Sequence, residues 1–87
     1  MSHFKDITSG LCETLESKNS DYGNSFDMLR NEYGMMSTLI RLGDKLNRLK
    51  TLTTTPAKVD ESIEDTLLDL AGYCCLELNY RKEREIG

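Results

Sequence analysis

The chain has no tryptophan, one proline and one histidine, and only 7% of its 87 residues are aromatic. Hydrophobic residues make up 38% of the sequence. A chain of this length buries a smaller fraction of its surface on folding than a larger domain does. We therefore expect one domain, residues 1–87, in which contacts between subunits supply part of the missing burial.

The sequence also lacks the excess of positive charge that is typical of nucleic-acid-binding surfaces. Its formal net charge is −4 and its isoelectric point is about 4.9. No apolar run approaches the length of about 18 residues that would predict a membrane span, and the N-terminus has no signal-peptide pattern. These features predict a protein that binds neither nucleic acid nor membrane.

The sequence has few cysteines, and their spacing does not predict disulfides or a metal site. Cys12, Cys74 and Cys75 make an odd number, and none of them forms a C-x-x-C spacing. This favours reduced thiols in a cytoplasmic protein, where they act as small hydrophobic side chains. A nucleophilic role for Cys75 would need a paired base, and the lone His3 lies in the N-terminal segment.

What the sequence does contain is apolar residues at helical spacing, and no strand pattern. The helices expected from this spacing span residues 3–18, 26–33, 35 to about 52, and about 60 to 81–85. The turn-forming residues between Lys18 and Ser25 are expected to end the first helix, and Gly34 the second. The segment 53–56 then joins the last two helices as an antiparallel hairpin. The predicted fold class is all-α.

Each hairpin helix carries a regular apolar stripe. In the third helix it consists of Met35, Leu39, Leu42, Leu46 and Leu49. In the fourth it consists of Ile63, Leu67, Leu70, Cys74 and Leu78.

The fourth helix also carries an acidic stripe. Glu61, Asp65 and Asp69 recur at every fourth position and therefore share one face of the helix. Like charges at this spacing repel each other, and leucines beside them suggest that the face is partly covered, which makes unpaired charge costly. A Mg²⁺ ion would compensate, because this cation prefers carboxylate oxygens. A solvated acidic face is an equally good interpretation of this helix alone.

Asp44 extends the acidic cluster to the third helix. It lies about as far before the midpoint of the hairpin as Asp65 lies after it, and at about 1.5 Å per residue the two acids reach similar heights. We therefore predict Asp44, Glu61 and Asp65 as metal ligands, since carboxylates from two helices commonly converge on a metal in a bundle. Lys45 and Arg48 are close enough in sequence to bind phosphate. A solvated basic edge, or ion pairs with the acids, would explain these two cations equally well.

The segment KNSDYGNSF, Lys18–Phe26, is dense in hydrogen-bonding groups. Tyr22 can stack on a base or sugar, and Asn19 and Asp21 can bind its edges. Alternatively the segment is only a joint between helices, in which Gly23 turns the chain and Asn24 or Ser25 caps the next helix. The local pattern favours the joint.

Three segments together resemble the nucleotide modification associated domain family, which is common in phages. They are KNSDYGNSF, LIRLGDKLNRLKTL and VDESIEDTLLDLAGYC, and they cover about two-thirds of the chain. That family is similar to the MazG-like all-α nucleoside triphosphate pyrophosphohydrolases, which bind Mg²⁺ through E-E-x-x-E and E-E-x-x-D motifs. The resemblance implies a small four-helix MazG-like bundle that is built on the helix hairpin and completed by oligomerisation as a homodimer or homotetramer. It also implies a cytoplasmic protein, which would act in the cytoplasm of the host if a phage encodes the chain.

The family motifs match individual residues in part. Glu61 and Asp65 correspond to the outer positions of E-E-x-x-D, Ser62 replaces the second glutamate, and Glu64 is a shifted equivalent. Asp44 offers one carboxylate where the pyrophosphohydrolases have two or three glutamates. Glu64 or Asp69 would act as the base that accepts a proton from the attacking water.

These observations lead to three hypotheses. The first is a Mg²⁺-dependent pyrophosphohydrolase that acts on ribo- or deoxyribonucleoside triphosphates or modified nucleotides. The second is a protein that binds or sequesters a nucleotide without turnover, which the sparse first motif favours. The third is a helical interaction module whose acidic residues are structural.

Overall fold

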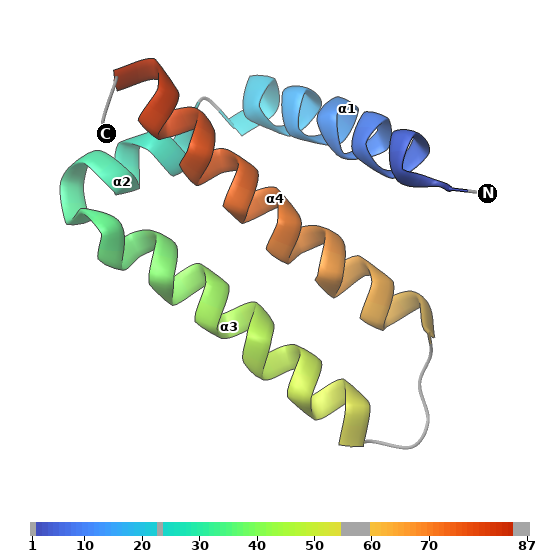
Figure 1. Ribbon diagram of the computed structural model, residues 1–87. Helices are drawn as coiled ribbons and strands as arrows, with labels where there is room; N and C mark the ends of the chain where they lie inside the picture. Colours follow the sequence, from blue (N-terminus) through green and yellow to red (C-terminus); the bar gives the residue numbers. More distant parts are fainter. Residues whose placement is uncertain (1, 23, 55–59, 85–87) are drawn as a thin grey trace.

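The protein is all-α, as predicted (Figure 1). The computed structural model describes residues 2–22, 24–54 and 60–84, and of residues 19–22 and 60–62 it describes only the backbone. The helices in these ranges are α1 (Phe4–Tyr22), α2 (Ser25–Tyr33), α3 (Met35–Thr54) and α4 (Asp60–Arg84). No helix within these ranges is long and apolar enough to cross a membrane. The predicted antiparallel hairpin is the pair α3–α4, with α2 beside one of its ends and α1 along α4 (Figure 1).

The first helix is longer than predicted. α1 continues to Tyr22, four residues beyond Lys18, so the prediction that the turn formers end it at that point was wrong. Serine, asparagine and aspartate are each less than about 1 kcal/mol worse than alanine in a helix, and such small penalties do not stop a helix that is already formed. The helix ends instead just before Asn24, which has the left-handed conformation (φ 62°, ψ 34°) that asparagine tolerates better than most residues. Asn24 occupies the N-cap of α2 as expected, although its side chain makes no capping hydrogen bond.

Gly34 ends α2, as its position predicts. Its backbone has φ 73° and ψ −162°, a combination that is essentially restricted to glycine. Its amide donates a hydrogen bond to the carbonyl of Arg30 at 2.9 Å, and α3 begins at the next residue. A single residue therefore makes the whole connection between α2 and α3.

The seam between α3 and α4 is built around small polar side chains. Thr38 of α3 is 0% exposed and Thr66 of α4 is 2% exposed. By contrast, Leu42, Leu49 and Leu70 of the same two helices are only half-buried. Larger side chains at the two threonine positions would hold the helices further apart, so these threonines allow the close approach of α3 and α4.

One buried carboxylate joins three helices at the end of the bundle where α2 lies. Glu77 of α4 accepts hydrogen bonds from Arg30 of α2 at 2.8 and 3.0 Å and from the Thr38 hydroxyl at 2.8 Å. Arg81, one turn along α4, donates to the same carboxylate at 2.7 Å. The pKa of Glu77 is consequently lowered to about 2, first by the hydrogen bond from Arg30 and then by those from Thr38 and Arg81.

Tyr80 completes this end of the bundle. Its ring is buried between two guanidinium groups, which lie 4.7 Å (Arg30) and 3.9 Å (Arg84) from the ring centroid. Its hydroxyl donates to Asn31 at 2.6 Å, and Arg84 also pairs with Asp27 at 3.7 Å. Cation–π and ionic contacts thus fix α2 against α4 where apolar side chains are few.

The first helix rests on α4 over a much smaller area. Among the described side chains of α1, only Leu11 and Leu15 are partly buried. They lie over Gly72 of α4, where a Cβ atom would stand 3.6 Å from Leu15 and 3.9 Å from Leu11. The absence of a side chain at Gly72 thus allows the two leucines of α1 to pack directly against the backbone of α4.

Candidate functional site

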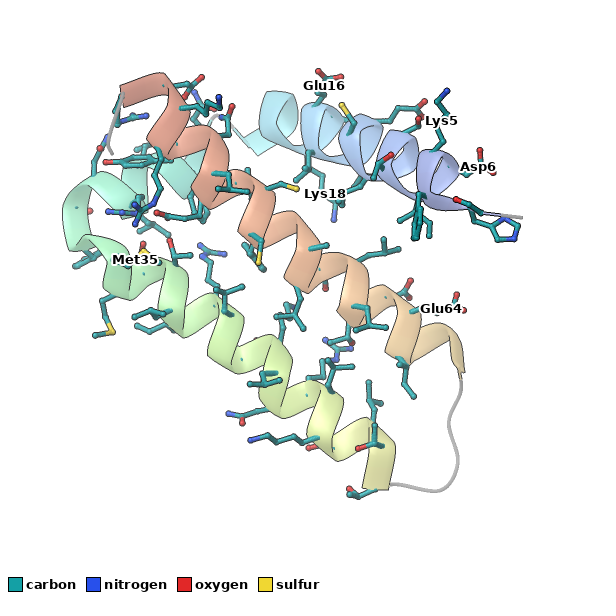
Figure 2. All side chains as sticks on the ribbon, in the orientation of Figure 1. Lys5, Asp6, Glu16, Lys18, Met35 and Glu64 are labelled. Atoms are coloured by element: carbon teal, nitrogen blue, oxygen red, sulfur yellow. The ribbon has the colours of Figure 1, made fainter. Side chains whose placement is uncertain are left out.

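A cleft of about 930 Å³ lies between α1 and the α3–α4 hairpin. We call it the α1 cleft. Its lining includes Leu11, Leu15 and Lys18 of α1, Phe26 of α2, Arg41 and Arg48 of α3, and Asp65, Leu68, Asp69, Gly72 and Tyr73 of α4. Lys18 lies on the α4 side of α1, whereas Glu16 and Lys5 point away from it (Figure 2). Three helices therefore contribute charged groups to one space.

Both signs of charge line the hairpin wall of the α1 cleft. Arg41 and Arg48 are two helical turns apart on one face of α3, and Asp65 and Asp69 are one turn apart on α4. Guanidinium groups form strong hydrogen bonds with phosphate, and carboxylates are the ligands that divalent cations prefer. The wall therefore carries the two kinds of group that a nucleotide and its bound cation need.

Lys45 pairs with Asp69 across the hairpin. The ammonium nitrogen lies 3.3 Å from the Asp69 carboxylate, and the two side chains are 17% and 43% exposed. Among the three interpretations that the sequence allowed for Lys45 (phosphate binding, a solvated edge or an ion pair with the acids), the described contacts show the ion pair. A pair this open to water adds little stability, but it partly neutralises Asp69 and holds Lys45 over α4.

Arg41 is a site residue that the sequence interpretation missed. Its guanidinium donates to the Tyr73 hydroxyl at 3.1 Å and lies 5.4 Å from the centroid of that ring. Tyr73 in turn packs against Phe26, with ring centroids 6.5 Å apart. The seven-residue spacing from Arg48 was the available signal for Arg41, but nothing in the sequence showed that Tyr73 would hold it.

Asp44 does not lie in the α1 cleft. It lines a separate, smaller cleft of about 260 Å³ together with Ile40, Arg41, Lys45 and Tyr73. The heights of Asp44 and Asp65 along the hairpin are not the obstacle. Successive helical residues differ by about 100° in direction, and Lys45 occupies the direction that points across to α4. Asp65 and Asp69 thus line the α1 cleft, whereas Asp44 lines the smaller cleft, which shares Arg41 and Tyr73 with it.

The remaining predicted site residues fall into two groups. Glu64 is exposed near the start of α4 and lines neither cleft (Figure 2). The side chains of Asn19, Asp21, Tyr22 and Glu61 lie outside the described residues. Among the side chains that are described, no three His, Cys, Asp or Glu residues gather closely enough to hold a metal ion.

Comparison with known proteins assigns the family. A family model described as Nucleotide modification associated domain 1 matches residues 18–78. The chain belongs to this family. The match confirms the resemblance noted in the sequence, and it includes α2, α3 and most of α4, with Arg41, Arg48, Asp65 and Asp69. Most of α1 precedes the part that is shared with the nucleotide modification associated domain. No curated protein and no solved structure matches the chain.

Proposed function

We propose that this nucleotide modification associated domain binds a ribo- or deoxyribonucleoside triphosphate, or a modified nucleotide, in the α1 cleft and hydrolyses it to the monophosphate and pyrophosphate with the help of Mg²⁺. The observation that carries this proposal is the common lining of one cleft by two arginines and two aspartates. A volume of about 930 Å³ is at the upper end of the range for small-molecule sites, and it leaves room for a nucleotide with its hydration water.

The phosphates are assigned to the arginines of α3. Arg41 is already oriented by the Tyr73 hydroxyl, so little side-chain freedom is lost when it binds an anion. Arg48 lies two turns further along the same wall, at a distance suited to a chain of phosphates rather than to a single one. Lys18 faces this wall from α1 (Figure 2) and adds a third cation.

Asp65, together with Glu61 one turn earlier, is assigned to Mg²⁺. The donor chemistry fits, because Mg²⁺ binds through one or two carboxylates plus substrate phosphates rather than in a cage of protein ligands. The ion would supply charge neutralisation at the phosphates and polarise a water molecule. We assign Asp69, next along the same stripe and in the same cleft, as the base that would accept a proton from the attacking water. Asn19, Asp21 and Tyr22, in the last turn of α1, remain the residues assigned to the nucleoside.

A second candidate is nucleotide binding without turnover. Two observations favour it: Asp69 is paired with Lys45 at 3.3 Å, and Asp44 lies outside the α1 cleft. The ion pair occupies Asp69, and a site without Asp44 has fewer metal ligands. In this case the same arginines hold the phosphates, and no bond is cleaved.

The test is an assay of pyrophosphate release from a panel of nucleoside and deoxynucleoside triphosphates, with and without Mg²⁺. We expect release that requires Mg²⁺ and that is lost in Asp65→Ala while the protein keeps its helical circular dichroism. Thermal stabilisation by a nucleotide without release would select binding alone. If neither release nor stabilisation were observed with any nucleotide, both candidates would be wrong, and the helical interaction module would remain.

Arg48→Ala tests the assignment of the phosphates. Loss of one charged hydrogen bond of about 1.5–3 kcal/mol should weaken nucleotide binding roughly 10- to 100-fold. Lys50→Ala removes the same charge from an exposed position on the same helix and should leave binding within about twofold at moderate ionic strength. Equal effects of the two substitutions would show that binding responds to net charge and not to the α1 cleft.

A further inference from the structure

The two walls of the α1 cleft differ in chemistry. The hairpin wall carries the arginines and aspartates to which phosphates and Mg²⁺ are assigned. Among the described side chains of α1 that line the cleft, only Asp6 and Lys18 are charged, and they lie about 18 Å apart along the helix. The lining residues between them are all neutral: Ile7, Gly10, Leu11, Thr14 and Leu15. Lys5 and Glu16 point away from α4 (Figure 2). A charged wall therefore stands opposite a neutral one.

Three of the neutral residues form a surface beside the contact between α1 and α4. Leu11 and Leu15 are partly buried in that contact. Ile7, Gly10 and Thr14 follow one another at intervals of three and four residues and therefore share one flank of the helix. We call these three residues the neutral wall. Ile7 is 53% exposed, Thr14 is exposed, and a Cβ atom added to Gly10 would meet nothing within 4 Å. The chain thus leaves this flank of α1 open to the cleft.

A nucleotide has the same two chemistries as the two walls. Its phosphates need cations, whereas its base is a planar ring with apolar faces and a polar edge. Gly10 has no side chain, so a ring can approach the backbone of α1 closely there. Ile7 supplies apolar contact, and the Thr14 hydroxyl can donate or accept a hydrogen bond at the edge of the ring. A phosphate on this wall would lie against side chains that carry no charge, so the wall suits the base and not the phosphates.

We propose that the neutral wall binds the base of the nucleotide and thereby determines which nucleotide the protein accepts. This inference rests on the proposed function, because it concerns the same cleft and the same ligand. The family match begins at residue 18, so the arginines and aspartates belong to the shared part of the chain and the neutral wall precedes it. The shared part binds the phosphates and the cation, which nucleoside triphosphates have in common, and α1 contacts the base, in which they differ. Asn19, Asp21 and Tyr22, which are assigned to the nucleoside, follow on the same helix.

Gly10→Leu tests the position of the base by placing a side chain in the space assigned to it. The probes are α,β-methylene analogues of nucleoside triphosphates, which cannot release pyrophosphate, and inorganic tripolyphosphate, which has no base. In calorimetric titrations with Mg²⁺ we expect the analogues to bind about tenfold or more weakly, whereas tripolyphosphate binds within about twofold of the wild type. Helical circular dichroism should be retained, because leucine is a better helix former than glycine and the position is open.

Gly43→Leu is the matched control. Gly43 lies within α3, lines neither cleft, and has nothing within 4 Å of an added Cβ atom. The same leucine at this position should leave the binding of the analogues and of tripolyphosphate unchanged.

Thr14→Val tests the selection of the base, since it removes a hydroxyl with little change of shape. We expect the affinity ratio of at least two analogues with different bases to shift about fivefold, as the loss of one hydrogen bond predicts, while tripolyphosphate binding is unchanged. Thr8→Val is the control on the same helix. The Thr8 hydroxyl donates to the Phe4 carbonyl at 2.9 Å and does not line the α1 cleft, so the ratios should stay as in the wild type.

The outcomes separate this inference from the proposed function. A wild-type protein that binds neither the analogues nor tripolyphosphate would overturn both. The neutral wall alone would be wrong if the wild type bound the analogues but Gly10→Leu left them unaffected or weakened both kinds of ligand equally. Ratios that shift no more in Thr14→Val than in Thr8→Val would likewise place the base elsewhere in the cleft.

Discussion

At the scale of the residue, Glu77 shows how polar groups replace apolar ones in this fold. Its side chain is 9% exposed and receives donors from Arg30, Thr38 and Arg81. Arg30 is 11% exposed, so each of the two charges depends on the other for its solvation. The main effect of the pair on stability is therefore the free-energy cost of removing one partner, which leaves the other charge buried and unpaired.

We predict that Glu77→Ala strongly destabilises the protein. Removal of the acid leaves Arg30 buried without a partner, at a cost of about 3 kcal/mol, which for a domain of this size corresponds to a fall in melting temperature of more than about 10 °C. Thermal unfolding followed by circular dichroism measures the change. Glu83→Ala is the control, because Glu83 is 57% exposed and its pair with Arg84 should contribute less than about 1 kcal/mol. Similar losses in the two variants would contradict the role given to Glu77.

The same carboxylate predicts the response to acid. The folded pKa of Glu77, about 2, is below that of a glutamate in an unfolded chain, about 4.3. The stability it contributes is therefore complete above about pH 5 and is lost as the pH falls towards 2. Urea midpoints between pH 7 and pH 2 should decline in the wild type over this window. Glu77→Gln should start lower and decline less, and parallel curves for the two proteins would exclude Glu77 as the titrating group.

At the scale of the element, glycines at two positions should respond in opposite ways to the same substitution. Gly34 has φ 73° and makes the turn between α2 and α3, so Gly34→Ala should cost about 1–3 kcal/mol through backbone strain. Gly43 lies within α3, and an added Cβ atom there would meet nothing within 4 Å, so Gly43→Ala should stabilise the protein by about 0.5–1 kcal/mol. Chemical denaturation of the two variants measures both effects, and a loss of stability in Gly43→Ala would mean that α3 is packed more tightly there than the contacts indicate.

The existence and order of the helices could be predicted from the sequence, because apolar spacing and Gly34 are local signals. The rotation of each hairpin helix about its own axis, which decides which side chains face the partner helix, could not be predicted. The leucine stripes indicated the packing faces, yet the seam runs through Thr38 and Thr66, and Leu39 and Leu67 are half exposed. Hydrogen bonding to Glu77 and close approach of the backbones decide the rotation, and both depend on residues distant in the sequence.

That same rotation decided how much of the candidate site could be predicted. The height of Asp44 relative to Asp65 follows from the length of the hairpin, but the cleft into which each side chain points depends on a turn of about 100° per residue. Asp65 and Asp69 were predicted because they lie on a regular acidic stripe, and Arg48 because it is close in sequence to Asp44. Arg41 was missed because its position depends on Tyr73, which is 32 residues away.

At the scale of the whole molecule, stability is unevenly distributed. The described part of α1 contacts α4 mainly through Leu11 and Leu15 above Gly72, whereas α2, α3 and α4 share the network around Glu77. The two parts should therefore open at different free energies.

Hydrogen exchange should show this difference. We predict that backbone amides of α1 exchange at least tenfold faster than those in the middle of α4, because little apolar surface is exposed when α1 separates. Leu15→Ala should widen the gap by accelerating exchange in α1 alone. Uniform protection of α1 and α4 in the wild type would mean that the four helices unfold as one cooperative unit.

The two buried threonines have a consequence for the site. Thr38 lies near the start of α3 and Thr66 near the start of α4, so in an antiparallel pair they stand towards opposite ends and act as two spacers of equal size. A bulkier residue at one of them would turn the parallel gap into a wedge, and the arginines of one helix would no longer face the aspartates of the other at a constant separation. The distance between the arginines and the aspartates across the hairpin is thus set by Thr38 and Thr66, two side chains that line neither cleft.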